Sequence, residues 1–275
     1  MAAPGSARHG DDRPAAATGV RLYVFPHAGG SGLMYQDWPA RFPPDWRVTA
    51  PDAPGHGTLM GERPLHDGDA LVDHYLDRLG PELDASDTPF AFFGHSMGAL
   101  VAYELTRRLV DGDRRTPVWL GLSACGAPRP GEPPARLPTR ELSDEELRQQ
   151  VARLGGTPPK VLDHPGLWRY FAPVIRADLR LVSSWRPAPA VTPLPVPVSL
   201  FGGARDTVVG VDALQRWAER CERLLAVHVF PGGHFYFHDD PDALADAVVL
   251  GVAAALRMPT EIPRLTATGS EIPCE

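Results

Sequence analysis

The stretch PFAFFGHSMGALVAYEL, residues 89–105, joins a short apolar run to a helix-like segment through the pattern G-x-S-x-G. In this pattern Gly94 and Gly98 flank Ser96 where a buried strand turns into a helix. Glycines at these positions permit a sharp, strained turn that lifts the serine oxygen clear of the backbone. The stretch therefore predicts a nucleophilic serine, and the alternative is a tight turn with an incidental serine.

On both sides of this stretch, short apolar runs alternate with helix-length segments. The runs are 20–26, 46–52, 89–94, 118–125, 196–203 and 224–232. The expected helices are 69–83, 99–110, 211–224 and 241–257. Near-continuous apolar runs are typical of parallel strands covered on both faces. We therefore predict an α/β fold with a mostly parallel central sheet and helices on both faces.

One region interrupts the alternation. Residues 126–195 begin with a proline-rich segment and continue with two helical pieces, 143–154 and 167–185, without a strand. We expect a helical lid insertion over one end of the sheet. The two ends of the chain, 1–19 and 258–275, lack periodicity and are predicted to be flexible tails. The rest of the chain, residues 20–257, is then one domain that carries the insertion.

Composition excludes several classes of protein. The chain has 275 residues, 43% of them hydrophobic and 22% charged, which is ordinary for a soluble globular protein. A net charge of -7 argues against nonspecific nucleic-acid binding. The three cysteines are too widely spaced for a disulfide framework or a C-x-x-C metal site. Neither a secretory signal nor a membrane-length apolar stretch is found, so we expect a cytoplasmic protein without membrane partners. We also expect a monomer.

A serine nucleophile needs a base, and the base needs an acid that orients it. In this architecture the acid and the histidine follow later strands, in that order. Asp206 lies just past the fifth apolar run, and His234 lies just past the sixth, after a glycine pair. We predict that these residues complete a triad with Ser96, although a turn aspartate and a loop histidine are the alternatives. His228 and His238 are second choices for the base.

The backbone amides that would stabilise an oxyanion are expected in two places. One is the N–H of Met97, directly after the serine, and the other lies in the loop PHAGGSG, residues 26–32, where we choose Ala28. A plain glycine-rich connection is the alternative, and a phosphate-binding loop lacks its usual motif.

Neither a metal nor a cofactor is expected. The sequence has no H-E-x-x-H motif, cysteine cluster or dinucleotide fingerprint. Cys125 follows a strand at the expected active-site edge, but such a cysteine is more often a small buried hydrophobe than a nucleophile.

Five motifs occur in order between residues 20 and 256: FPHAGGSG, DAPGHG, GHSMGALVAYEL, LFGGARDTVV and FPGGHFYFHD. With them the chain resembles type II thioesterases, the discrete editing enzymes of polyketide synthase and nonribosomal peptide synthetase pathways. The resemblance implies an α/β-hydrolase fold and hydrolysis of acyl thioesters on the phosphopantetheine arm of acyl carrier or peptidyl carrier domains. It also implies that Ser96, Asp206 and His234 form the triad and that the amides of Ala28 and Met97 form the oxyanion hole.

The chain departs from that resemblance at two places. His56 stands where many relatives have an arginine, and Cys125-Gly126 replaces a basic pair. Acyl preference and carrier contacts therefore stay open. A general esterase or an acyltransferase acting on small esters would use the same triad and is the main alternative. A non-catalytic binding protein of the same fold is disfavoured by the complete set of site residues.

The insertion differs in charge from the remainder of the chain. Residues 126–190 hold ten basic and seven acidic residues, a net charge of +3, which leaves -10 for the rest. We expect this surface to meet the phosphate of the arm and an acidic carrier. The candidate arginines are Arg148, Arg153, Arg176 and Arg180. The alternative is that they only solvate a helix surface.

Overall fold

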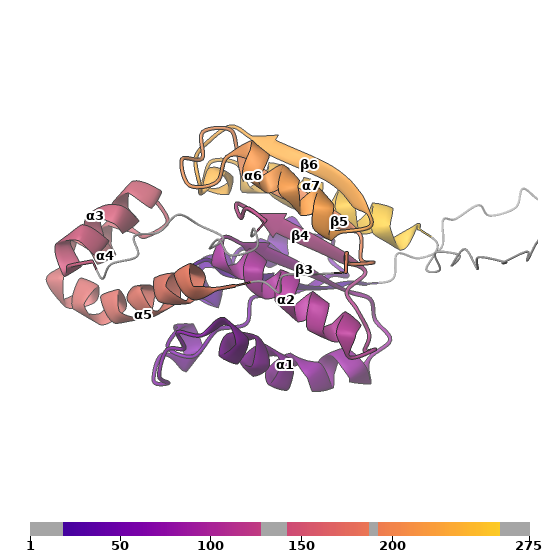
Figure 1. The fold of residues 1–275 in the computed structure, drawn as a ribbon, viewed down its shortest axis with the longest axis horizontal. Coiled ribbons are helices and arrows are strands. Elements are labelled where there is room, and N and C mark those ends of the chain that lie inside the picture. Colours follow the sequence, from indigo (N-terminus) through magenta and orange to yellow (C-terminus); the bar gives the residue numbers. More distant parts are fainter. Residues whose placement is uncertain (1–18, 128–141, 187–191, 259–275) are drawn as a thin grey trace, which may run out of the picture.

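The computed structural model describes residues 19–127, 142–186 and 192–258. In this part of the chain six parallel strands form one sheet in the order β2-β1-β3-β4-β5-β6. The strands are β1 (Arg21–Phe25), β2 (Arg47–Thr49), β3 (Phe90–His95), β4 (Trp119–Ser123), β5 (Val198–Gly203) and β6 (Leu224–Phe230). Each strand lies within one of the predicted apolar runs, or extends one residue beyond it. The predicted parallel α/β architecture is confirmed (Figure 1).

The side chains of the four central strands, β1, β3, β4 and β5, are buried, and in each strand they point alternately to the two faces of the sheet. In β3, Phe92 belongs to one hydrophobic cluster and Phe93 to another. The first cluster includes residues of α1 (Gly68–Ala85), α2 (Met97–Asp111) and α6 (Val211–Gln215), and the second includes residues of α7 (Pro241–Leu256). Each fully buried Phe or Leu contributes about 1.5–3 kcal/mol, so these two clusters hold the helices against the faces of the sheet.

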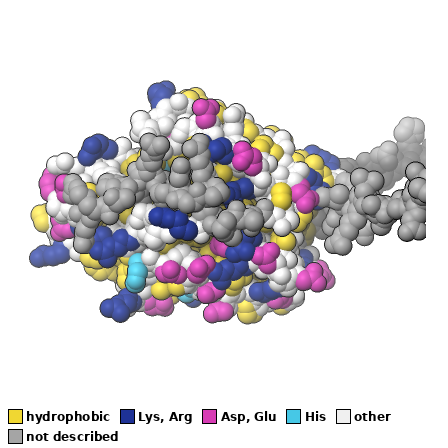
Figure 2. Space-filling view, in the orientation of Figure 1, with side chains coloured by type: hydrophobic (Ala, Val, Ile, Leu, Met, Phe, Trp, Pro, Cys, Tyr) yellow, Lys and Arg dark blue, Asp and Glu magenta, His cyan; other side chains and the backbone are white. Residues whose placement is uncertain are grey.

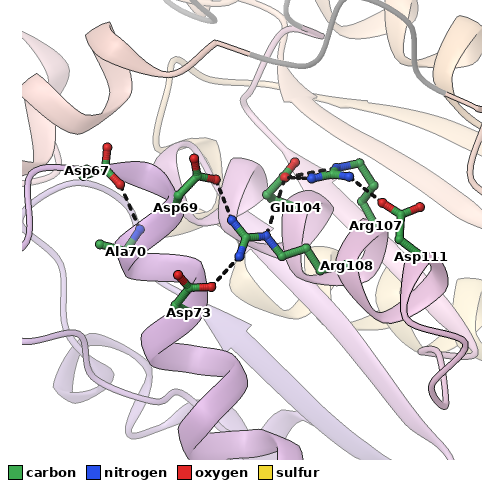
Figure 3. A network of polar contacts seen from close by, with 8 residues as sticks. All are labelled: Asp67, Asp69, Ala70, Asp73, Glu104, Arg107, Arg108 and Asp111. Carbon is green, nitrogen blue, oxygen red and sulfur yellow. Dashed lines mark hydrogen bonds and ion pairs between the residues drawn. The ribbon is translucent and has the colours of Figure 1, made fainter.

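Helices α1 and α2 are also joined at the surface by ion pairs. Arg108 of α2 contacts Asp69 and Asp73 of α1, and Glu104 contacts Arg107 within α2 (Figure 3). The α1 carboxylates are largely exposed, so solvent screens these charges. These ion pairs therefore add little to stability, and the buried apolar contacts supply most of the stabilisation.

The prediction of one helix over residues 211–224 is wrong in its second half. The α-helix α6 ends at Gln215, a 3₁₀ helix covers Arg216–Arg220, and β6 already begins at Leu224. The tighter 3₁₀ turn accompanies the burial of Trp217, whose indole N–H donates to the carbonyl of Cys125 at 2.8 Å. A buried tertiary contact has overridden the helical periodicity.

Three helices lie between β4 and β5. They are α3 (Asp144–Leu154), α4 (Pro159–Asp163) and α5 (Pro165–Ser184). Their apolar faces form a separate cluster that includes Val151 and Ile175, and Figure 1 shows the three helices grouped at one end of the sheet. The short α4 was not predicted because five residues are too few for a periodic pattern. The proline-rich start of the insertion and both expected tails lie almost wholly outside the described residues.

Candidate active site

Ser96 lies in a strained turn between β3 and α2. Its backbone has φ 55° and ψ -114°, a conformation that costs a non-glycine residue roughly 1–3 kcal/mol. The two flanking glycines make this turn possible. A Cβ on Gly94 would lie 2.0 Å from the carbonyl oxygen of Gly98, and a Cβ on Gly98 would lie 1.9 Å from that of Phe25. The turn therefore requires glycine at both positions and presents the serine at the carboxyl end of the sheet.

The three predicted polar side chains are in hydrogen-bond contact. His234 Nε2 lies 3.0 Å from Ser96 Oγ, and His234 Nδ1 lies 2.8 Å from Asp206 Oδ2. The other carboxylate oxygen of Asp206 accepts the backbone N–H groups of Val208 and Val209 at 2.8 and 3.1 Å. Because an ionised carboxylate only accepts, His234 Nδ1 carries the proton. Its Nε2 lone pair then faces the serine hydroxyl, as a general base requires.

The second-choice histidines lie elsewhere. His228 stacks on Phe201 within the sheet, and His238 stacks on Phe235. Burial lowers the pKa of both imidazoles. Within the described part of the chain, the hydrogen bond to Ser96 comes from His234.

The glycine-rich loop after β1 forms a tight turn beside the serine. The N–H of Gly30 donates to the carbonyl of His27 at 2.8 Å, and Gly29 has φ 77°, which glycine adopts without strain. Ala28, between His27 and Gly29, lines the same cavity as the serine, and Met97 is the first residue of α2. Both residues chosen for the oxyanion amides thus lie near the serine, Ala28 in the loop after β1 and Met97 at the start of α2.

A mostly apolar cavity opens at this point. It encloses about 560 Å³ of empty space, part of it open to solvent, with Ser96 and His234 in its wall. Aliphatic side chains of the insertion helices also line it: Val151, Leu154, Ile175, Leu179 and Val182. A reactive serine at the wall of an apolar cavity fits an acyl group bound next to its carbonyl carbon.

Comparison with known proteins identifies the family. The model of the thioesterase domain matches residues 20–249. This chain belongs to the thioesterase family. "Gramicidin S biosynthesis protein GrsT" of Aneurinibacillus migulanus is 32% identical over 223 residues, covering 81% of this chain and 85% of that protein. "Thioesterase PikA5" of Streptomyces venezuelae is 29% identical over 226 residues, covering 82% and 78%.

A solved structure gives the same result for the fold. The type II thioesterase BorB from the borrelidin biosynthetic cluster is 33% identical, with a TM-score of 0.73 over 87% of this chain and 95% of that one. The predicted α/β-hydrolase fold and the resemblance to type II thioesterases are confirmed. This chain is a hydrolase that acts on thioesters.

Two further histidines pack against the site of the thioesterase as neutral groups. Burial and neighbouring imidazoles lower the pKa of His27 to about 3 and that of His95 well below its usual value. His95 Nδ1 lies 2.8 Å from Ser123 Oγ, which in turn contacts the Tyr236 hydroxyl at 2.7 Å. Because both imidazoles stay uncharged at neutral pH, they shape the site without adding positive charge beside the serine.

Cys125 is a packing residue in this thioesterase. It is 5% exposed, and burial raises the pKa of its thiol to about 12. A thiol that stays protonated at neutral pH is a poor nucleophile. The structure therefore agrees with the interpretation of this cysteine as a small buried hydrophobe.

One contact near the site was not predicted. Asp178 of α5 bonds both to His56, in the loop after β2, and to the backbone N–H of Gly29. A signal for it does exist in the sequence, because Asp178 lies on the apolar face of α5 with Ile175 and Leu181. An aspartate on such a face requires a buried partner, but the pattern does not say which residue that is.

Within the described ranges, no group of three or more His, Cys, Asp or Glu residues is arranged to hold a metal ion. The helices of the same ranges include none with the length and apolar character needed to span a membrane.

Proposed function

We propose that this thioesterase hydrolyses acyl groups from the phosphopantetheine thioester of acyl carrier or peptidyl carrier domains, and so clears stalled or mis-primed polyketide or nonribosomal peptide synthases. The observation that carries the proposal is the hydrogen-bonded series Ser96–His234–Asp206 at the wall of an apolar cavity. The names of the relatives support the pathway, and they do not favour the alternative of an esterase or acyltransferase acting on small esters.

In the first half of the reaction, Ser96 Oγ attacks the thioester carbonyl while His234 Nε2 takes its proton. Asp206 holds the imidazole in the required tautomer and stabilises the imidazolium that forms. The tetrahedral intermediate then breaks its C–S bond, and His234 returns the proton to the departing pantetheine thiolate. The acyl group remains as an ester on the serine.

In the second half, water replaces the thiol. His234 takes a proton from water, the hydroxide attacks the acyl ester, and the proton returns to Ser96 Oγ as the carboxylic acid leaves. In both halves the negative oxygen would accept the backbone N–H groups of Ala28 and Met97. An oxyanion hole of this kind typically contributes about 2.7–4 kcal/mol per donor.

The proposal predicts a substrate preference. One acyl group is offered as a carrier-protein thioester, as a short pantetheine thioester and as an oxygen ester, each with and without a metal chelator. We expect kcat/KM to be highest for the carrier-bound group, lower for the pantetheine thioester and lowest for the ester, with no effect of the chelator. Equal rates on all three substrates would favour the esterase alternative, and loss of activity with the chelator would contradict metal-free catalysis.

The carrier is proposed to dock on the insertion, although the structure changes the choice of arginines. Arg148 and Arg176 are half-buried, with Glu145 and Asp144 respectively as ion-pair partners. The Arg176 pair joins α5 to the start of α3, and the Arg148 pair lies within α3. Arg153 and Arg180 are exposed, and Arg169 joins them. Figure 2 shows several Lys and Arg side chains at the end of the molecule where α3, α4 and α5 lie in Figure 1.

Reversing the charge of the exposed arginines tests this surface. We expect the triple change Arg153→Glu, Arg169→Glu, Arg180→Glu to raise KM for the carrier-bound substrate about tenfold at low salt, because it replaces attraction by repulsion. The pantetheine thioester, which lacks the carrier, should be hydrolysed at the normal rate. The control is Arg257→Glu, an exposed arginine after α7. An equal response of both substrates would place carrier recognition on another surface.

A further inference from the structure

One buried carboxylate oxygen joins three parts of the active site. Asp178 of α5 is 2% exposed, and its Oδ2 accepts the backbone N–H of Gly29 at 2.6 Å. The same oxygen lies 2.8 Å from Nε2 of His56, which is 5% exposed. The insertion helix, the turn that carries Ala28 and the loop after β2 thus meet at a single atom.

The contacts of His56 define its protonation state. Its Nδ1 lies 3.0 Å from the carbonyl oxygen of Pro54, and its Nε2 faces the Asp178 carboxylate. Both partners only accept hydrogen bonds, so both are satisfied only when both ring nitrogens carry a proton. The geometry therefore requires an imidazolium.

The surroundings support that charge. Burial by itself lowers the pKa of His56, but the hydrogen bond and charge of Asp178, together with the Pro54 carbonyl and the charge of Asp52, raise it above the usual histidine value. The other titratable groups nearby are His27, kept neutral by its lowered pKa, and the Tyr75 phenol, kept neutral by its raised pKa.

The bond from Asp178 bears directly on the oxyanion turn. In the turn from His27 to Gly30, the Gly29 N–H belongs to the central peptide, which is the unit that rotates when such a turn changes type. The Ala28 N–H belongs to the preceding peptide. A firm acceptor on Gly29 therefore holds this central peptide in one orientation, and so keeps the turn that carries the Ala28 N–H in one form.

We propose that Asp178 and His56 are positioning residues, which hold the oxyanion turn in its active form as long as His56 is protonated. This inference rests on the proposed role of Ala28 in the reaction. As pH rises through the elevated pKa of His56, the imidazolium loses a proton and one of its two acceptors then faces a lone pair. The charged pair is complete below that pKa and is lost above it, so kcat should fall on the alkaline side.

The test is the pH profile of kcat and KM for a short pantetheine thioester. We expect the wild-type kcat to fall several-fold above the usual histidine range while KM stays nearly constant. His56→Arg keeps a positive charge at all these pH values and should remove the alkaline decline while preserving kcat at neutral pH. Asp178→Asn should lower kcat about tenfold or more throughout, since a neutral amide is a weaker acceptor for Gly29.

Asp144→Asn is the matched control. Asp144, at the start of α3, pairs at 2.7 Å with Arg176 of α5, the helix that also carries Asp178, and does not touch the oxyanion turn. It should leave kcat and its pH profile unchanged. The inference is overturned if His56→Arg keeps the wild-type alkaline decline, if the wild type has none, or if folded Asp178→Asn retains full kcat. Ser96→Ala is measured alongside: if it is inactive, these outcomes overturn only the positioning role, and if it is active, the proposed function itself fails.

Discussion

Replacement of Ser96 by alanine is expected to abolish acyl-enzyme formation. With a pantetheine thioester, intact-protein mass spectrometry should show one added acyl group on the wild type during turnover and none on Ser96→Ala. The reason is geometric, since the serine hydroxyl is the group that His234 Nε2 contacts, at 3.0 Å. An acylated Ser96→Ala protein would place the nucleophile on another residue.

The two supporting side chains should also have large effects. His234→Ala removes the base, and Asp206→Asn removes the acceptor that fixes its tautomer, so we expect each to lower kcat by about three orders of magnitude or more. KM should change little because neither group is needed for binding the pantetheine arm. His238→Ala is the control, and its kcat should stay within about twofold, because that imidazole stacks on Phe235 rather than contacting the serine. A nearly active His234→Ala enzyme would contradict the proposed base.

Local patterns predicted the sheet and the series Ser96–His234–Asp206, because each depends on short-range signals. Near-continuous apolar runs indicate buried parallel strands, and the carboxyl ends of such strands meet at one edge. A serine between glycines, an aspartate after the fifth run and a histidine after the sixth were therefore brought together by topology alone. No side-chain contact had to be known in advance.

Contacts between distant segments were not predictable in the same way. Asp178 and His56 are 122 residues apart, and their pairing depends on how α5 packs over the loop after β2. The break in the helix expected over residues 211–224 likewise depends on Trp217 reaching the Cys125 carbonyl, 92 residues away. Periodicity describes which face of a helix is buried, but it does not identify the atoms that the face will meet.

Gly98→Ala should be among the most damaging single substitutions outside the polar residues of the site. In an ordinary helix, alanine is favoured over glycine by about 1 kcal/mol. Here the added Cβ would lie 1.9 Å from the carbonyl oxygen of Phe25 and 2.7 Å from that of Pro26, so β1 and α2 must move apart. We expect a net loss of about 3 kcal/mol or more, which lowers the melting temperature by roughly 6–12 °C.

The same displacement should reduce activity in the molecules that remain folded. Phe25 and Pro26 lead directly into the turn that carries Ala28, so pushing them away from α2 also moves one proposed oxyanion donor away from the serine. A shift of about 1 Å in such a site costs on the order of a hundredfold in rate. Gly61→Ala is the matched control because a Cβ there meets no atom within 4 Å, and it should change stability by less than about 0.5 kcal/mol. A Gly98→Ala protein that melts and turns over like the wild type would mean that β1 and α2 separate without strain, and the requirement for glycine in this turn would then be wrong.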